Sequence, residues 1–229
     1  VGTSANAGNA QFDLAVSVAA ITVTGGNDGG AEDSSVEFEG ALTANTITLT
    51  DTNSTRTATA VFDPAGAFTY AGTVLGSGSG QGNLIIRDDD DNAVPDVVTF
   101  SGVIGATTLD TLTVGDAGAA AGSAKFTNTV AIATAITVSG GNDDAEDSSV
   151  EFEAAITAAS ITLTDTTAAR TATAIFDANA GDITYAGTVT GGSANQGILI
   201  VRDEDATTTA PNTVTFTGVI GGTNDPGVL

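Results

Sequence analysis

The chain contains two copies of one unit, and this repetition limits what it can fold into. The segment AITVTGGND at 20–28 returns as AITVSGGND at 135–143, and EDSSVEFE at 32–39 returns at 146–153. VTFSGVIG at 98–105 likewise returns as VTFTGVIG at 214–221, so the offsets stay between 114 and 116 residues. Repetition at this level is typical of modular structural proteins. We therefore divide the chain into repeat unit 1 at residues 1–113 and repeat unit 2 at residues 114–229.

Within each unit the ordered stretches have the alternation of β-strands. They are rich in Thr, Val and Ile, and Gly and Asn interrupt them. Before the break TANT at 43–46, Val36 and Phe38 share one parity, and after it Ile47 and Leu49 take the other. A change of parity across a short polar break predicts a strand, a corner and a second strand. Almost no segment has helical periodicity.

A shorter period lies inside the large one. Phe12 and Phe38 are 26 residues apart, and the same step separates Phe100 from Phe126 and Phe126 from Phe152. A step of about 20–30 residues that holds two or three short strands suits one coil of a β-solenoid. Stacked coils place like residues above like, so these phenylalanines are predicted to point inward and to form a ladder.

The fold class is therefore all-β, a β-solenoid-like stack of short strands in two repeats of about 115 residues. The alternative is two tandem β-sandwich domains, because strands spaced by about 8–12 residues and units of about 100 residues suit that class as well. The 26-residue step from Phe100 to Phe126 crosses the boundary between the units without a Pro-rich or Ser-rich linker, which favours the solenoid. The stretch 76–97 does not fit the 26-residue frame.

Charge and composition exclude several classes of function. Five Lys and Arg residues face 28 Asp and Glu residues, for a net charge of −23, so nucleic acid is not an expected partner. Such a surface attracts cations. Cys, Met, Trp and His are all absent, which excludes disulfides, thiol nucleophiles, zinc clusters and imidazole bases. No apolar run approaches the roughly 18 residues that a membrane span needs, so we expect no direct membrane insertion.

An acidic loop is the first candidate metal site. In unit 1 it follows the strand NLIIR and includes Asp88, Asp90 and Asp96, and in unit 2 it includes Asp203 and Asp205. Calcium takes six to eight oxygen ligands from a loop that folds around it. The pattern therefore predicts a calcium site, and the alternative is a solvated acidic loop that keeps a strand edge unpaired.

A second acidic segment repeats as GGNDGGAEDSS at 25–35 and GGNDDAEDSS at 140–149. Its candidate calcium ligands are Asn27, Asp28, Asp33, Asp143 and Asp147. The segment resembles the glycine- and aspartate-rich calcium turns of RTX proteins, but it departs from their GGxGxD pattern and does not run in tandem. The alternative is an ordinary Gly-Asn turn.

Catalysis is not expected. Paired carboxylates serve glycosidases, but such sites normally add aromatic platforms and often a Lys, Arg or His base. This chain offers only Tyr70 and Tyr185, at equivalent positions of the two units, besides its phenylalanines. Arg56 and Arg170 are interpreted as partners of Asp51 and Asp165 in structural ion pairs, or else as outward-pointing side chains.

Three segments carry a resemblance to a known family: FEGALTANTITLTDT at 38–52, FSGVIGATTLDTLTVG at 100–115 and FEAAITAASITLTDT at 152–166. They resemble the "beta strand repeat" regions of bacterial surface proteins, including autotransporter-like adhesins and S-layer-like proteins. The resemblance implies an extracellular or cell-surface location, and self-association or adhesion without catalysis. The expected function is thus an extracellular structural protein, a self-assembling subunit of a filament, sheath or surface layer. The alternative is the stalk or binding module of a large adhesin, with a cell-surface glycan as a partner.

The expected partner is a second copy of the same chain. Both ends of the sequence look like ends of a repeat unit, and exposed strands at the end of a solenoid recruit other strands. We therefore expect a head-to-tail homopolymer in which residues 1–20 of one subunit meet residues 210–229 of the next.

Overall fold

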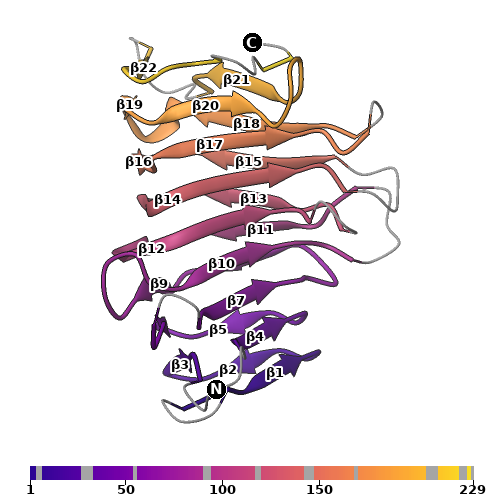
Figure 1. Cartoon of the computed structure of the whole chain (residues 1–229), viewed down its shortest axis with the longest axis vertical. Coiled ribbons are helices and arrows are strands. Elements are labelled where there is room, and N and C mark those ends of the chain that lie inside the picture. Colours follow the sequence, from indigo (N-terminus) through magenta and orange to yellow (C-terminus); the bar gives the residue numbers. More distant parts are fainter. Residues whose placement is uncertain are drawn as a thin grey trace.

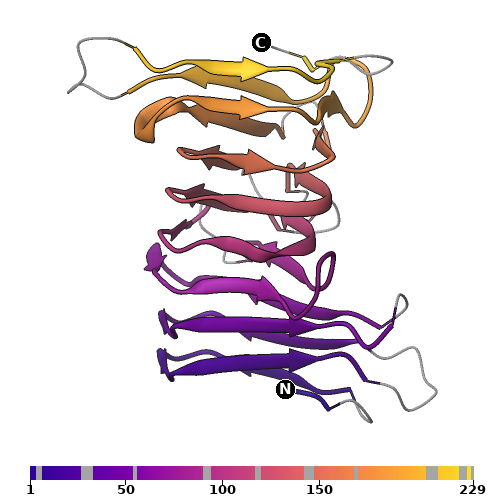
Figure 2. The same ribbon diagram turned by 90° about the vertical axis from the view of Figure 1, so that its left-hand side faces the viewer.

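The computed structural model is a β-solenoid of about seven coils, stacked from the N-terminal end to the C-terminal end (Figures 1 and 2). It describes the chain apart from residues 4–6, 27–32, 54–55, 90–93, 117–119, 142–146, 168–169, 205–210, 222–225 and 228–229. Strands account for nearly all of the regular structure, and the only helix in the described part is a single 3-10 turn.

Unit 1 contributes twelve strands, most of them four or five residues long. They are β1 (Asn9–Phe12), β2 (Val16–Ser17), β3 (Ala20–Thr24), β4 (Ser34–Phe38), β5 (Leu42–Thr43), β6 (Thr46–Thr50), β7 (Ala58–Phe62), β8 (Phe68–Tyr70), β9 (Thr73–Gly76), β10 (Asn83–Ile86), β11 (Val97–Phe100) and β12 (Ile104–Val114).

Unit 2 repeats most of this order, with the single strand β14 in place of β2 and β3. Its elements are β13 (Ser123–Phe126), β14 (Val130–Ser139), β15 (Ser148–Phe152), β16 (Ile156–Thr157), β17 (Ser160–Thr164), β18 (Ala172–Asp177), the 3-10 helix η1 (Ala178–Ala180), β19 (Ile183–Tyr185), β20 (Thr188–Gly191), β21 (Ile198–Arg202) and β22 (Val214–Phe216).

The named strands pair in parallel, and most pairs place equivalent residues side by side. Phe12 pairs with Phe38, and Phe126 pairs with Phe152. Because side chains alternate between the two faces of a strand, this register fills the interior with Phe, Val, Ile and Leu and turns Thr and charged residues outward. The solenoid prediction is confirmed.

The two units form one continuous stack rather than two domains. One sheet runs in the order β1-β4-β7-β10-β12-β14-β17-β20, and another runs in the order β21-β18-β15-β13-β11-β8, so both cross the boundary between the units. The alternative of two separate β-sandwich domains is therefore wrong. The first strand of unit 2, β13, pairs with β11. It does not pair with β10, because β12 already pairs with that strand.

An aromatic column runs through the core, as the spacing predicted. Ring centroids lie 5.4 Å apart between Phe38 and Phe62, 5.0 Å between Phe62 and Phe100, and 5.0 Å between Phe100 and Phe126. The sequence interval between Phe62 and Phe100 is long because β8, β9 and β10 lie within it. This is why the stretch 76–97 does not fit a 26-residue frame. Phe12 departs from the prediction, since it stacks on Phe38 at 5.8 Å but stays 37 % exposed.

Candidate functional site

The acidic loop after β10 is closed by its own carboxylate. The side chain of Asp88 is buried and accepts the backbone N–H of Asp96, and the N–H of Asp88 donates to the carbonyl of Ala121 at 2.7 Å. In unit 2 the carboxylate of Asp203 accepts the backbone N–H of Asn212 at 2.7 Å. Two further predicted ligands lie outside the described residues: Asp90 and Asp205. Among the described residues these carboxylates therefore tie together the two sides of a loop.

The second predicted segment behaves in a similar way. Asp33 accepts the backbone N–H of Thr57 at 2.8 Å, and Asp147 accepts that of Thr171 at 2.7 Å. Each carboxylate thus connects one coil to the next. The other predicted ligands of this segment lie outside the described residues: Asn27, Asp28 and Asp143.

Within the described residues, one group of three carboxylates comes close enough to share a metal ion, and it contains none of the predicted ligands. Glu151, Glu153 and Asp177 have carboxylate oxygens within 4.8 Å of one another. They lie on or directly after the adjacent strands β15 and β18. Calcium at the two predicted loops stays a prediction.

Two basic side chains already pair with the three carboxylates of this group. Lys125 Nζ lies 2.8 Å from Glu151 and 2.6 Å from Glu153. The Arg202 guanidinium lies 3.0 Å from Glu151 and 2.9 Å from Asp177. The cluster is therefore a network of ion pairs that runs along β13, β15, β18 and β21 across successive coils, which we call the charge ladder.

Unit 1 contains a similar arrangement with fewer ion pairs among the described residues. Arg87 contacts Glu37 at 2.5 Å and Asp63 at 2.7 Å, as Arg202 contacts Glu151 and Asp177. At the position of Lys125, however, unit 1 has Gln11, whose amide donates to Glu39. The charge ladder of unit 1 therefore contains one cation fewer.

Burial and pairing shift the acid–base properties of these groups in different directions. Burial raises the pKa of Asp63, and hydrogen bonds from Arg87 and from the backbone of Asp89 only partly oppose it. Burial alone would lower the pKa of Lys125, but its hydrogen bonds to Glu151 and Glu153 outweigh that cost, and the pKa is raised. The basic members of the ladder thus stay charged at physiological pH.

Two further aspartates hold the coils together through the backbone. Asp51 accepts the N–H groups of Ala58 at 2.7 Å and Gly82 at 2.9 Å. Asp165 does the same for Ala172 and Gly197, at 2.9 Å each. Both oxygens of each carboxylate therefore serve backbone donors of later coils. These are the two residues that the sequence proposed as partners of Arg56 and Arg170.

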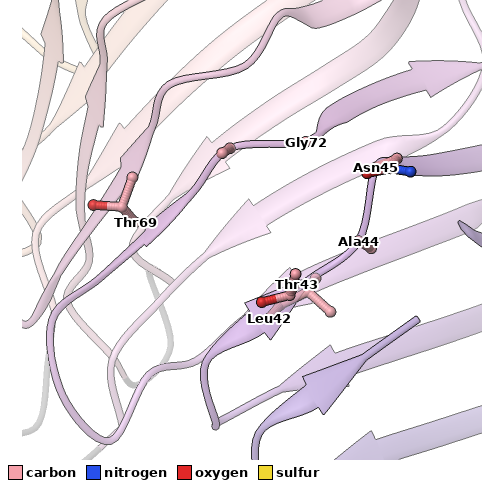
Figure 3. A pocket seen from close by; sticks show the side chains of 7 residues that line it. Leu42, Thr43, Ala44, Asn45, Thr69 and Gly72 are labelled. Atoms are coloured by element: carbon pink, nitrogen blue, oxygen red, sulfur yellow. The ribbon is translucent and has the colours of Figure 1, made fainter. Parts of the chain in front are cut away.

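A shallow groove of about 250 Å³ lies between β5 and β8. Figure 3 shows Thr43 and Asn45 on one side of it, and Thr69 and Gly72 on the other. Its lining offers hydroxyl groups, one side-chain amide and short apolar side chains, and it contains no charged side chain. The groove has the groups for weak hydrogen bonding but not for acid–base chemistry.

The charge ladder has a signal in the sequence that a search for acidic loops does not detect. Lys125 and Glu151 are 26 residues apart, and Asp177 and Arg202 are 25 apart. The first interval equals the 26-residue step from Phe126 to Phe152, and the second lies close to the 24-residue step from Phe152 to Phe176. Applied to charged residues, the same rule finds the ion pairs.

Comparisons with protein-family models, with curated proteins and with solved structures found no match. Among the residues that the structure describes, no helix has the length and apolar character needed to cross a bilayer.

Proposed function

We propose that this chain is an extracellular structural protein, a subunit that assembles with copies of itself into a filament, sheath or surface layer. The observation that carries the proposal is the state of the two end faces of the solenoid. At the N-terminal end, Phe12, Leu14 and Val18 are exposed, and at the C-terminal end Val201 and Val219 are exposed. Large apolar side chains gathered on the end of a parallel stack mark a surface for further β-pairing.

The remainder of the molecule suits a passive structural role. In the described part, Asp33, Asp51, Asp147 and Asp165 bind backbone groups of neighbouring coils, and the charge ladder pairs its acids with basic residues. These contacts hold coils in register. Carboxylates used in this way are not available as a catalytic acid and base, so we propose no enzymatic function.

Electrostatics set the conditions for assembly. With a net charge of −23, two copies repel each other at low ionic strength. Salt screens this repulsion beyond about 10 Å at 0.1 M, and divalent cations neutralise it further. We therefore expect assembly to need salt or calcium, and nucleic acid to stay unbound.

Electron microscopy and sedimentation test the proposal directly. The purified chain is examined over a range of concentrations, in low salt, in high salt, in millimolar calcium and in chelator. Filaments or arrays, with a sedimentation coefficient that rises with concentration, are the expected result. A monomer under every one of these conditions contradicts the proposal.

The alternative is a stalk or binding module of a large adhesin. A rod of stacked coils serves as a rigid spacer, and the groove of Figure 3 presents Thr43, Asn45 and Thr69 as hydrogen-bonding groups for a glycan. A monomer that binds immobilised cell-surface glycans supports this alternative. Filaments without glycan binding favour the structural protein.

A further inference from the structure

The junction between the two units is a template for contact between two molecules. We propose that β22 of one copy pairs in parallel with β1 of the next copy, in the register Val214↔Ala10, Thr215↔Gln11 and Phe216↔Phe12. The inference rests on the proposed self-assembly and names the surfaces and the register that assembly uses.

The template is the pairing of β11 with β13. There Val98 lies beside Ala124, Thr99 beside Lys125, and Phe100 beside Phe126. The rings of Phe100 and Phe126 stack with centroids 5.0 Å apart and planes 15° apart. β22 (VTF) is the unit 2 equivalent of β11, and β1 (NAQF) is the unit 1 equivalent of β13, so one molecule carries both halves of this contact on opposite ends (Figures 1 and 2).

Both halves are exposed at the ends and buried at the junction. Phe12 is 37 % exposed, whereas its counterpart Phe126 is fully buried. On the other face, Val201 is 51 % exposed, whereas its counterpart Ile86 is fully buried. Ile220, at 36 %, has the fully buried Ile104 as its counterpart. Apolar residues at the same places in the fold thus lack the neighbour that the junction provides.

Backbone geometry extends the match beyond the strands themselves. At the junction the N–H of Thr127 donates to the carbonyl of Phe100 at 3.0 Å, and the N–H of Gly115 donates to that of Ile86 at 2.8 Å. Asp13 and Gly2 are the counterparts of these donors. Gly2 even has the same backbone conformation, with φ of +71° against +74° at Gly115. In the proposed contact they donate to Phe216 and Val201 of the neighbouring copy.

A second copy fits these faces because the contact can repeat. Unit 2 repeats the sequence of unit 1. The C-terminal face of unit 2 therefore resembles the face of unit 1 that contacts unit 2 at the junction. A contact between two different surfaces of identical subunits does not close on itself when it continues a straight stack, so it produces an open filament. Phe216, which meets Phe176 at 4.9 Å and Tyr185 at 6.3 Å, then takes the place of Phe100 in an unbroken aromatic column.

Engineered cysteines test the register, since the chain has no cysteine of its own. The variants T215C and Q11C are purified separately, mixed under assembly conditions and oxidised. Residues side by side on adjacent parallel strands lie within the roughly 4.4–6.8 Å Cα separation that a disulfide needs. Mixing should give one crosslinked dimer, and the double variant should give a ladder of oligomers. T215C alone should give none, and T215C mixed with N9C, two residues out of register, should give much less.

Two pairs of substitutions provide an independent test by sedimentation. D13P removes the N–H that corresponds to the donor of Thr127, while D13A removes the same charge and keeps the N–H. V201K places a charge where Ile86 is buried at the junction, while V201I keeps an apolar side chain. Asp13 and Val201 are both exposed, so each variant should keep the melting temperature of the wild type. D13P and V201K should weaken assembly about tenfold or more, and the two control variants should not.

The possible outcomes of these experiments test the proposed strand register and the proposed self-assembly separately. Filaments that form normally from D13P and V201K, or crosslinking that is equal for Q11C and N9C, overturn the register and leave self-assembly standing. A wild-type chain that stays monomeric at every concentration and ionic strength overturns both.

Discussion

The first strand of unit 1, β1, and the first strand of unit 2, β13, occupy equivalent positions and share their Ala and Phe residues, but they have different surroundings. β1 reads NAQF and pairs only with β4 among the described strands, whereas β13 reads SAKF and lies between β11 and β15. Phe12 is therefore 37 % exposed and Phe126 is buried. At the neighbouring position, Gln11 makes one contact with Glu39, and Lys125 bridges two glutamates.

This comparison distinguishes two effects: the sequence of a strand sets which side chains face the core, and the position of the strand in the stack sets how deeply they are buried. The alternation of the sequence decides which side chains face the core, since Phe12 and Phe126 both stack on the phenylalanine of the next coil. Neighbours on both sides decide how completely they are buried. A unit of this kind is thus fully stabilised only inside a stack, which is the property expected of an assembling repeat.

The largest expected effect comes from truncating the two phenylalanines. F126A removes a buried ring held between Phe100 and Phe152 and should cost about 3–5 kcal/mol of unfolding free energy. F12A should cost clearly less, because its ring is partly solvated and has one stacking neighbour. Denaturant unfolding at low protein concentration, where the chain is monomeric, measures both. Equal losses contradict the view that neighbours on both sides determine stability.

A second comparison concerns the acidic loops after β10 and β21. The unit 1 loop offers Asp88, Asp90 and Asp96, while the unit 2 loop has Asn212 in place of the third. If calcium binds, it stabilises the chain by mass action, by about 2.7 kcal/mol at a concentration 100 times the Kd. D90N should then remove more of the calcium-dependent rise in melting temperature than D205N. Melting curves that coincide in millimolar calcium and in chelator contradict the prediction of calcium binding.

Most of the fold could be predicted from the sequence because a solenoid is built from local alternation and a repeat length. The parity of Val36 and Phe38 and the 26-residue steps sufficed for the strands and for most of the column. The route of the column between Phe62 and Phe100 could not be predicted. It depends on β12 passing beside β10, which is a pairing between strands far apart in sequence.

The site was predicted less well, for a physical reason. Loop composition drew attention to residues such as Asp88 and Asp33, but these carboxylates satisfy backbone N–H groups, and composition does not distinguish that role from metal binding. The charge ladder involves residues such as Lys125 and Glu151 that are adjacent only after coils stack. A pattern read along one strand does not contain that neighbourhood.

Exchanging the residue that distinguishes the two charge ladders gives a smaller effect. K125Q leaves Glu151 and Glu153 without their shared cation and should lower the unfolding free energy by about 1 kcal/mol, because the pair is partly solvated. Q11K supplies a cation beside Glu39 and should stabilise by a few tenths of that, roughly 0.3 kcal/mol. Both differences should shrink in high salt, where the charges are screened. Effects independent of salt contradict an ionic origin.

The smallest expected effect is a pH dependence that comes from Asp63. Burial raises its pKa in the folded chain above the ordinary value of 3.8, although Arg87 opposes the shift. The folded state therefore holds a proton on Asp63 more readily than the unfolded state does. It follows that the contribution of Asp63 to stability grows as the pH falls from neutrality through the folded-state pKa, and is lost as the pH rises again.

The measurement compares the melting temperature of the wild type with that of D63N at pH 7 and at about pH 5, in dilute solution. The advantage of the wild type over D63N should be larger at the lower pH. D13N is the matched control, because it removes one carboxylate from an exposed position directly after β1 and reports the change in net charge alone. An advantage that falls on acidification, with D13N unchanged, shows that the ion pair with Arg87 outweighs burial at this site, and that the charge ladder of unit 1 needs its ionised aspartate.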